Sequence, residues 1–235
     1  MIVRPCGDRL WLITQPDHAR LARRVMEHCV PLASCLRRDA ILHAIAEHDN
    51  GWAEEDAAPR VNPDTGQPFD FISAPNSVRQ GVWPRGVARL ADDPWAAALV
   101  AQHAITVYDR YLDDSEWTPF FAAMEEARDR MVLASGLPPD ELMTDYAFVR
   151  LADLISLTFC VGWTDEHRFG EWVVRRVDEC VVVAPDAFGG KDIPVEINAR
   201  EVRRQVFQSD ADLRAAVAEA NVTTLKGVVN DEIAP

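Results

Sequence analysis

The chain has 235 residues, and its 38 acidic and 24 basic side chains give a formal net charge of −14. This negative excess rules out a general electrostatic attraction to nucleic acid or to an acidic membrane surface, so we expect neither as a partner. The hydrophobic fraction of 48% is ordinary for a globular protein, and the length suits one large or two small domains. No apolar run approaches the roughly 18 residues that a membrane helix needs.

The five cysteines are scattered, odd in number and never spaced as Cys-x-x-Cys. This usage is typical of reduced thiols and not of a disulfide framework or a thiolate zinc site. The first residues also lack the basic segment and apolar run of a signal peptide. We therefore expect a cytoplasmic protein.

Residues 2–13 are predicted to form a β-hairpin that turns at Gly7 and Asp8. A helix is expected to follow from Thr14, which is a candidate N-cap residue. Pro31 should end or kink this helix, because proline cannot donate the backbone hydrogen bond of a helix interior.

A second helix is predicted over about residues 37–48, with His48 on its apolar face at the carboxyl end. Asn50 and Gly51 then supply a stop signal. Residues 54–75 are rich in Pro, Gly and Asp and show no sustained period. We expect a long loop there, placed so that it can cover a site at His48.

The middle of the chain predicts further helices at about residues 76–91, 94–113, 115–135 and 138–162, the last of them buried on most of its circumference. Beyond Gly170, β-branched runs predict strands at about 178–184, 193–197 and 222–229, with a helix at 209–220. The expected fold is mainly α, in one domain spanning residues 1–235. A helical core over residues 14–165 would carry a small antiparallel sheet formed from the two chain ends, 1–13 and 171–235.

The sequence His-Asp-Asn-Gly-Trp at residues 48–52 places an imidazole next to a carboxylate. Both groups bind divalent metals, and adjacent side chains can bind one ion terminally while bridging to a second. Partners for this pair lie on the predicted helices at His18, His103 and Asp153. Because no thiolate accompanies them, the donor set favours iron, manganese, zinc or magnesium.

Each of these residues also has an ordinary explanation. A lone histidine on an apolar helix face is often a hydrogen-bonded core residue. Asp153 can pair with Arg150 one turn earlier, and His48 can act as a cation at a helix carboxyl end. A single metal site explains all the candidates together, and it compensates the charge of a carboxylate buried in an apolar helix.

The order of these residues resembles the HD superfamily of metal-dependent phosphohydrolases, over roughly residues 14–165. The resemblance implies that His18, His48, Asp49 and Asp153 surround one ion, that Asp49 bridges when a second is present, and that His103 is an additional ligand. Two-metal members often use one more histidine, so the number of ions, one or two per chain, stays open. The start at residues 1–4 and the signature at 48–52 are also similar to those of a bacterial family defined as a domain of unknown function.

The resemblance implies hydrolysis of a phosphate ester of a small molecule or nucleotide by a metal-activated water. Asp49 would then be catalytic, and Glu54 is a candidate for a second carboxylate that orients a ligand. Arg79 and Arg85, interleaved with Trp83, could bind a phosphorylated substrate, although ordinary solvated arginines are the simpler explanation.

Two other functions are compatible with the same residues. One is a di-iron oxygenase similar to myo-inositol oxygenase, and the other is a non-catalytic metal-binding or interaction protein. A homodimer is compatible with the sequence, which does not determine the oligomeric state.

Overall fold

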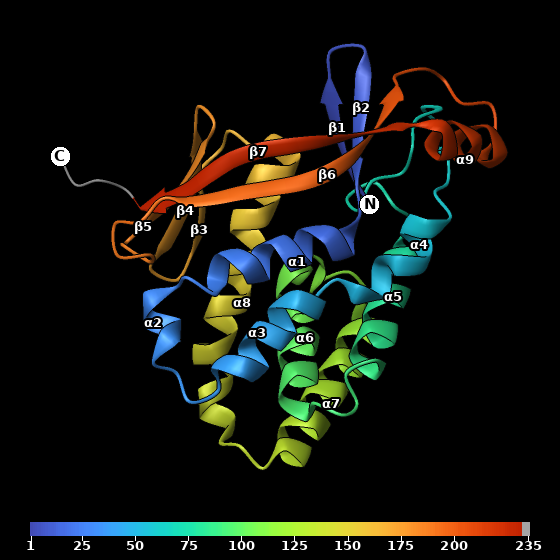
Figure 1. Ribbon diagram of the computed structural model, residues 1–235. Coiled ribbons are helices and arrows are strands. Elements are labelled where there is room, and N and C mark those ends of the chain that lie inside the picture. The colour runs from blue at the N-terminus through green and yellow to red at the C-terminus, as the bar shows by residue number, and fades with distance from the viewer. Residues whose placement is uncertain (232–235) are drawn as a thin grey trace.

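The computed structural model describes residues 1–231 and places a body of helices beneath a long curved sheet (Figure 1). The main helices of the body are α1 (Gln15–Met26), α3 (Arg38–Glu47), α5 (Asn76–Ala88), α6 (Pro94–Val107), α7 (Thr118–Ser135) and α8 (Leu142–Leu157). Shorter helical segments are α2 (Val30–Ala33), α4 (Ala53–Ala57) and the single turns η1 (Asn50–Trp52), η2 (Asp109–Tyr111) and η3 (Pro139–Glu141). Helix α8 ends in a π-helical segment, η4 (Thr158–Gly162).

Helix α6 lies at the centre of this body and packs against α3, α5, α7 and α8. Its residues from Trp95 to Ala104 are all buried, which explains why its sequence is apolar on every side. Helix α8 is buried almost as completely from Leu151 to Leu157. Side chains that point from these two helices toward one another therefore lie deep in the protein.

The local signals at the start of the chain are confirmed by the hairpin of β1 (Ile2–Cys6) and β2 (Arg9–Ile13). Thr14 caps α1 by accepting a hydrogen bond from the backbone N–H of Asp17. Pro31 has a different role from the predicted one, because α1 ends at Met26 and Pro31 lies in the first turn of α2.

Asn50 and Gly51 do not stop the second helix in the predicted way, because the chain continues into η1 and α4. Gly51 is required by a close approach to α5: a Cβ at this position would lie 2.0 Å from the carbonyl oxygen of Val82. The glycine in the signature thus brings the His-Asp doublet close to α5. The predicted loop at 54–75 also begins with α4 and becomes irregular only after it.

The predicted mainly α fold with a small antiparallel sheet is wrong. The sheet has seven strands in the order β1-β2-β6-β7-β5-β4-β3, and β5 pairs with β7 in parallel. Its remaining strands are β3 (His167–Phe169), β4 (Trp172–Val177), β5 (Cys180–Ala184), β6 (Ile193–Arg203) and β7 (Asn221–Asp231). Both ends of the described chain belong to it, but so does the segment directly after α8.

The physical reason for this error is the length of the strands. Alternate residues of β6 are buried from Ile193 to Ala199, so the period of two continues beyond the predicted end at Ile197. Strand β7 pairs with β6 from Val229 back to Asn221, and this pairing extends both strands together. In β4, Arg175 and Arg176 interrupt the apolar alternation, and the sequence therefore gave no strand signal there.

One large hydrophobic core joins the helices to the underside of the sheet, and α1 contacts β6 directly. A second, smaller core lies between the hairpin, β6 and α9 (Asp210–Glu219), and it is formed by Met1, Leu10, Leu12, Val202, Phe207 and Leu213. The helix predicted at 209–220 is confirmed as α9, which Ser209 caps by accepting a hydrogen bond from the backbone N–H of Asp212.

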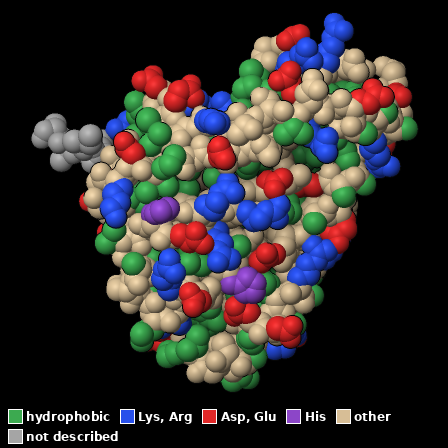
Figure 2. All heavy atoms as spheres, viewed as in Figure 1, with side chains coloured by type: hydrophobic (Ala, Val, Ile, Leu, Met, Phe, Trp, Pro, Cys, Tyr) green, Lys and Arg blue, Asp and Glu red, His purple; other side chains and the backbone are tan. Residues whose placement is uncertain are grey.

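Basic and acidic side chains are interspersed on the face of the protein shown in Figure 2. Among residues 1–231, no helix combines the length and apolar character needed to cross a membrane.

Candidate metal centre

The five predicted metal ligands come from four elements and meet in the interior. His18 lies on α1, His48 caps the carboxyl end of α3 with Asp49 directly after it, His103 lies on α6 and Asp153 on α8. None is more than 6% exposed. They form two groups, one of His18, His48 and Asp49 and one of His48, His103 and Asp153, in which the ligand atoms lie within 4.8 Å of one another.

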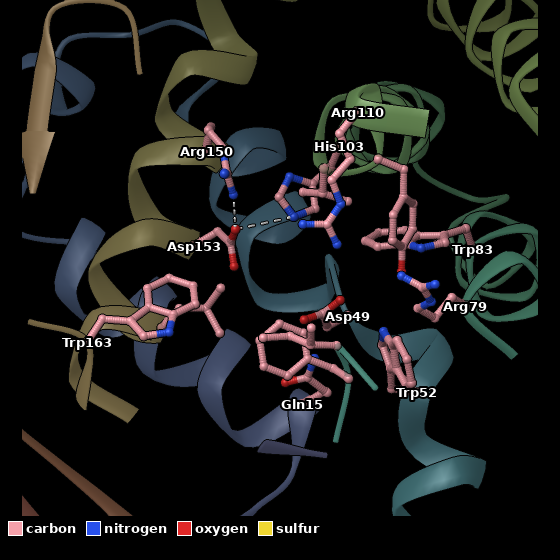
Figure 3. Close-up of a pocket in the computed structure, with 15 residues that line it drawn as sticks. Gln15, Asp49, Trp52, Arg79, Trp83, His103, Arg110, Arg150, Asp153 and Trp163 are labelled. Carbon is pink, nitrogen blue, oxygen red and sulfur yellow. Dashed lines mark hydrogen bonds and ion pairs between the residues drawn. The ribbon is translucent and has the colours of Figure 1, made fainter. Parts of the chain in front are cut away.

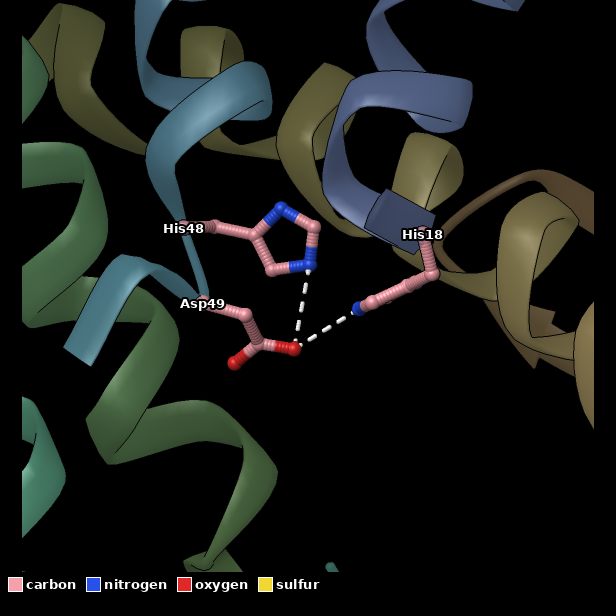
Figure 4. Close-up of side chains that lie close together, drawn as sticks. All are labelled: His18, His48 and Asp49. Carbon is pink, nitrogen blue, oxygen red and sulfur yellow. Dashed lines mark hydrogen bonds and ion pairs between the residues drawn. The ribbon is translucent and has the colours of Figure 1, made fainter. Parts of the chain in front are cut away.

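The Nε2 atoms of the three histidines all face carboxylate oxygens. His18 Nε2 lies 2.7 Å from Asp49 Oδ2, and His48 Nε2 lies 3.6 Å from the same oxygen (Figure 4). His48 Nε2 is also 3.5 Å from Asp153 Oδ1, and His103 Nε2 is 3.7 Å from Asp153 Oδ2. The central imidazole of His48 therefore connects the two carboxylates.

The other ring nitrogen of each histidine is held by the surrounding protein. His48 Nδ1 lies 2.7 Å from the carbonyl oxygen of Ile45, to which it must donate because a carbonyl only accepts. His18 Nδ1 lies 2.9 Å from Ser156 Oγ, and His103 Nδ1 lies 3.1 Å from the Tyr146 hydroxyl. Such contacts on the outer nitrogen fix the tautomer and the ring orientation of metal-binding histidines.

This hydrogen-bond network leaves acceptors facing acceptors. Ser156 donates its own hydrogen to the carbonyl oxygen of Asp153, so Ser156 Oγ accepts from His18 Nδ1. In a neutral His18 the ring hydrogen is therefore on Nδ1, and the lone pair of Nε2 points at the carboxylate of Asp49. The Nε2 atom of His48 is likewise buried without a hydrogen-bond partner. A cation between these atoms, either a proton or a metal ion, relieves the repulsion.

The electrostatics indicate the same need for positive charge. Burial disfavours the charged form of His48, but Asp49 and Asp153 outweigh it and raise the pKa of His48 to about 9. Burial lowers the pKa of His103 to about 3. Burial opposes ionisation of Asp153 as well, yet His48, His103 and Arg150 hold the pKa of Asp153 well below its ordinary value. The cluster therefore holds two carboxylates that stay ionised in the interior.

The His/Asp cluster opens into a cavity of about 190 Å³ (Figure 3). Asp49, His103 and Asp153 contribute to its wall, and Arg150 on the same wall forms an ion pair with Asp153. The remaining lining is mostly aromatic, aliphatic or basic: Gln15, Trp52, Phe71, Ile72, Arg79, Trp83, Val107, Tyr108, Arg110, Leu157 and Trp163. Metal-binding groups, cations and aromatic rings thus face one small space.

Two of the three predicted substrate-binding residues line this cavity, namely Arg79 and Trp83. Arg85 does not, because its Nε donates to the carbonyl oxygen of Gly51 and its guanidinium pairs with Glu54 and Glu55. Glu54 also lies outside the cavity lining: its side chain is half exposed and is paired with Arg85 and Arg89. Phe71 and Ile72 from the predicted covering loop do reach the cavity.

Several residues of the site were not identified from the sequence. Ser156 lies one helical turn after Asp153, a spacing that could have indicated it as a neighbour of the ligands. Tyr146 and Arg110 have no local signal, because both reach the site only through tertiary packing: Tyr146 of α8 lies against His103 of α6, and Arg110 lines the cavity from η2. The sequence indicates Arg150 only as an alternative partner for Asp153, whereas in the structure it both pairs with this candidate ligand and lines the cavity.

Residues 1–204 match the family described as "Protein of unknown function (DUF3891)", and the chain therefore belongs to this family. No curated protein and no solved structure matches the chain significantly.

Proposed function

We propose that this member of the DUF3891 family is a metal-dependent hydrolase that acts on a phosphate ester of a small molecule. The observation that carries the proposal is the convergence of three imidazole Nε2 atoms, each on a ring held at Nδ1, with two buried carboxylates at the wall of a cavity. The order of these ligands along the chain is similar to that of the HD phosphohydrolases, which favours this reaction class among those open to a His/Asp site.

The arrangement of the ligand atoms favours one divalent ion per chain. His48 belongs to both groups of candidate ligands, and its Nδ1 is engaged by Ile45, so only Nε2 is available. The two groups therefore share a ligand that can bind one ion. Imidazole and carboxylate donors without thiolate suit iron, manganese or zinc. When bound, the ion supplies Lewis acidity toward a phosphoryl oxygen and toward an attacking water.

The protein groups around the cluster have distinct roles in this proposal. Ser156 and the Ile45 carbonyl hold the imidazoles of His18 and His48 in orientation. Arg150 fixes the carboxylate of Asp153, and its charge lies where a phosphate oxygen would approach the cluster. Aromatic side chains such as Trp52 line the cavity and limit its volume, which is smaller than the roughly 300 Å³ of a usual ligand pocket. A small phosphate ester fits such a space better than a nucleotide does.

The first test is elemental analysis of protein purified without chelator, beside the variants His48→Ala and Asp49→Ala. We expect about one iron, manganese or zinc per chain in the parent protein and none in either variant. His43→Ala is the matched control, since His43 precedes the doublet on α3 but bonds to Asp93 outside the cluster. Metal-free parent protein that stays folded and cannot be reconstituted would overturn the proposal.

The second test is a panel of phosphate monoesters and diesters, assayed with the metal found in the first test. Release of phosphate or alcohol should depend on that metal and should be lost in Asp49→Ala. An oxygen-uptake assay run beside it separates hydrolysis from the oxygenase reaction. Oxygen consumption without ester hydrolysis would contradict the proposed reaction.

A further inference from the structure

Arg79 is a buried cation that has no acidic partner among the residues that the structure describes. Its side chain is 8% exposed, and it donates to the Tyr111 hydroxyl at 3.1 Å and to the side-chain oxygen of Asn76. Its guanidinium lies 5.2–5.8 Å from the ring centroids of Tyr108, Tyr111 and Trp117. Its Nε finds no hydrogen-bond partner, and no ion pair links Arg79 to a carboxylate anywhere in residues 1–231.

Such an arrangement is unfavourable for a protein without a ligand. A buried guanidinium normally pairs with a carboxylate, because the loss of hydration is otherwise not compensated. The aromatic rings offset part of this loss through cation–π attraction, but they do not neutralise the charge. Arg37 provides the contrast within the same chain, since it binds Asp145 through two nitrogens and Glu141 through one.

Arg79 lines the same cavity as the metal ligands but does not touch them. Trp83 lies between: its ring is 5.5 Å from that of His103 and 6.1 Å from that of Tyr108, over which Arg79 lies. In Figure 3, Arg79 and Arg150 approach from opposite sides of Asp49. A phosphate bound at the His/Asp cluster would therefore meet Arg150, which leaves Arg79 for another part of the substrate.

We infer that Arg79 binds a second anionic group of the substrate, a carboxylate or a second phosphate. The substrate class is then a small phosphate ester with two anionic ends, one at the cluster and one at Arg79. Arg110 lies 4.9 Å from the ring centroid of Tyr111, which Arg79 also contacts, and it adds positive charge to the lining of the same cavity. The inference rests on the proposed function for the phosphate end alone, because the missing counter-charge of Arg79 is independent of any metal.

The experiment compares three phosphonates that cannot be hydrolysed, by calorimetric titration of the protein with and without metal. The first is 3-phosphonopropionate, which carries a carboxylate, and the second is ethane-1,2-diphosphonate, which carries a second phosphonate. The third is 3-methylbutylphosphonate, which has the shape of the first without its second charge. We expect the better of the two compounds with two anionic groups to bind at least tenfold more tightly than the third. The order of their affinities identifies whether the second group is a carboxylate or a phosphate.

Variants of Arg79 test whether this preference arises at the proposed place. Arg79→Met should reduce the preference to less than twofold, and Arg79→Lys should restore part of it. Arg130→Met is the matched control, because Arg130 is exposed on α7 and pairs with Glu126, away from the cavity. If Arg79→Met does not fold, the comparison of the three ligands on the parent protein still decides, since equal affinities overturn the inference.

The outcomes separate this inference from the proposed function. Metal binding without a preference for two anionic groups, or with a preference that Arg79→Met leaves unchanged, overturns the inference and leaves the metal site standing. A preference that depends on Arg79 in a protein that binds no metal supports the anion site and overturns the hydrolase. A protein that binds no metal and shows no preference for two anionic groups overturns both the hydrolase proposal and the anion site.

Discussion

Two buried aspartates on α8 lie two helical turns apart and have opposite surroundings. Asp145 accepts from Arg37 through two nitrogens, from the indole N–H of Trp95 at 2.8 Å and from Cys35. Asp153 lies beside Arg150 and the Nε2 atoms of His48 and His103, which are 3.5–3.7 Å away. Both side chains are nearly inaccessible, at 1% and 2% exposed.

The difference shows how a structural carboxylate can be distinguished from a candidate ligand. Every contact of Asp145 is a donor that the folded chain already supplies, so nothing more is needed to compensate its charge. Around Asp153 the nearest imidazole nitrogen is an acceptor when neutral, and the carboxylate also faces a cavity. Burial by itself therefore does not indicate function. A buried group does indicate function when the donors or acceptors around it lack hydrogen-bond partners.

Asp153→Asn should have the largest effect on metal binding. The substitution removes a carboxylate that lies between two imidazoles, and we expect metal affinity to fall by at least about 100-fold. The metal-free variant should still fold, because Arg150 is 23% exposed and can turn toward solvent. Competition with a fluorescent chelator measures the affinity. Unchanged affinity would remove Asp153 from the ligand set.

Asp145→Asn should have the converse effect. It leaves the guanidinium of Arg37 without its main counter-ion, and we expect the free energy of unfolding to fall by about 3 kcal/mol. Metal content per folded chain should stay at that of the parent protein. Urea unfolding measures the first quantity and elemental analysis the second. Loss of metal from folded Asp145→Asn would show that the two sites are coupled.

The metal-free protein should lose stability as the pH rises from about 6.5 to about 9. His48 has a folded pKa of about 9, above its unfolded value of 6.5, so its stabilising protonation is complete below pH 6.5 and disappears through pH 9. The loss is at most about 3 kcal/mol. Bound metal replaces that proton, and the slope should therefore vanish in metal-loaded protein. Urea unfolding at several pH values measures this dependence. The control His43→Ala should show the same fall in stability with pH. A metal-free protein whose stability rises over this range would contradict the prediction.

Ser156→Ala should have the smallest effect of the four. The hydroxyl of Ser156 orients His18 without being a ligand itself. We expect metal affinity to fall about tenfold while the metal still binds one per chain. Ser156→Thr, which keeps the hydroxyl, should recover affinity if the pocket accepts the added methyl group. An alanine variant with parental affinity would show that packing alone orients His18.

The sequence predicted more of the candidate site than of the fold. His48 and Asp49 were recognisable as adjacent candidate ligands, and their order relative to His18, His103 and Asp153 pointed to one cluster. Helical spacing placed His48 on an inward face, and the structure brings all five side chains together. Glu54 was grouped with the site because it follows the His-Asp doublet, and Arg85 because it is interleaved with Trp83 and could bind a phosphate. Their ion pairs hold both side chains away from the cavity.

The sheet shows why local patterns were not sufficient. The hairpin at residues 2–13, the cap at Thr14 and the helix after residue 209 depend on contacts within a few residues, and the sequence predicted them correctly. The parallel pairing of β5 with β7 joins residues more than 40 positions apart and has no local signal. Long-range pairing also lengthened β6 beyond the stretch that alternation had indicated.

The sequence by itself determined the hairpin at residues 2–13, the N-cap at Thr14 and the set of side chains that could bind a metal ion, because these follow from local turn and cap signals and from donor chemistry. Only the tertiary structure decided which acceptors face one another, since the tautomer of His18 depends on Ser156, 138 positions away. It also decided that Asp145 has a basic partner in Arg37, whereas Arg79 meets no carboxylate among residues 1–231. Whether a buried charge has a partner depends on the packing of distant helices, which no short stretch of sequence specifies.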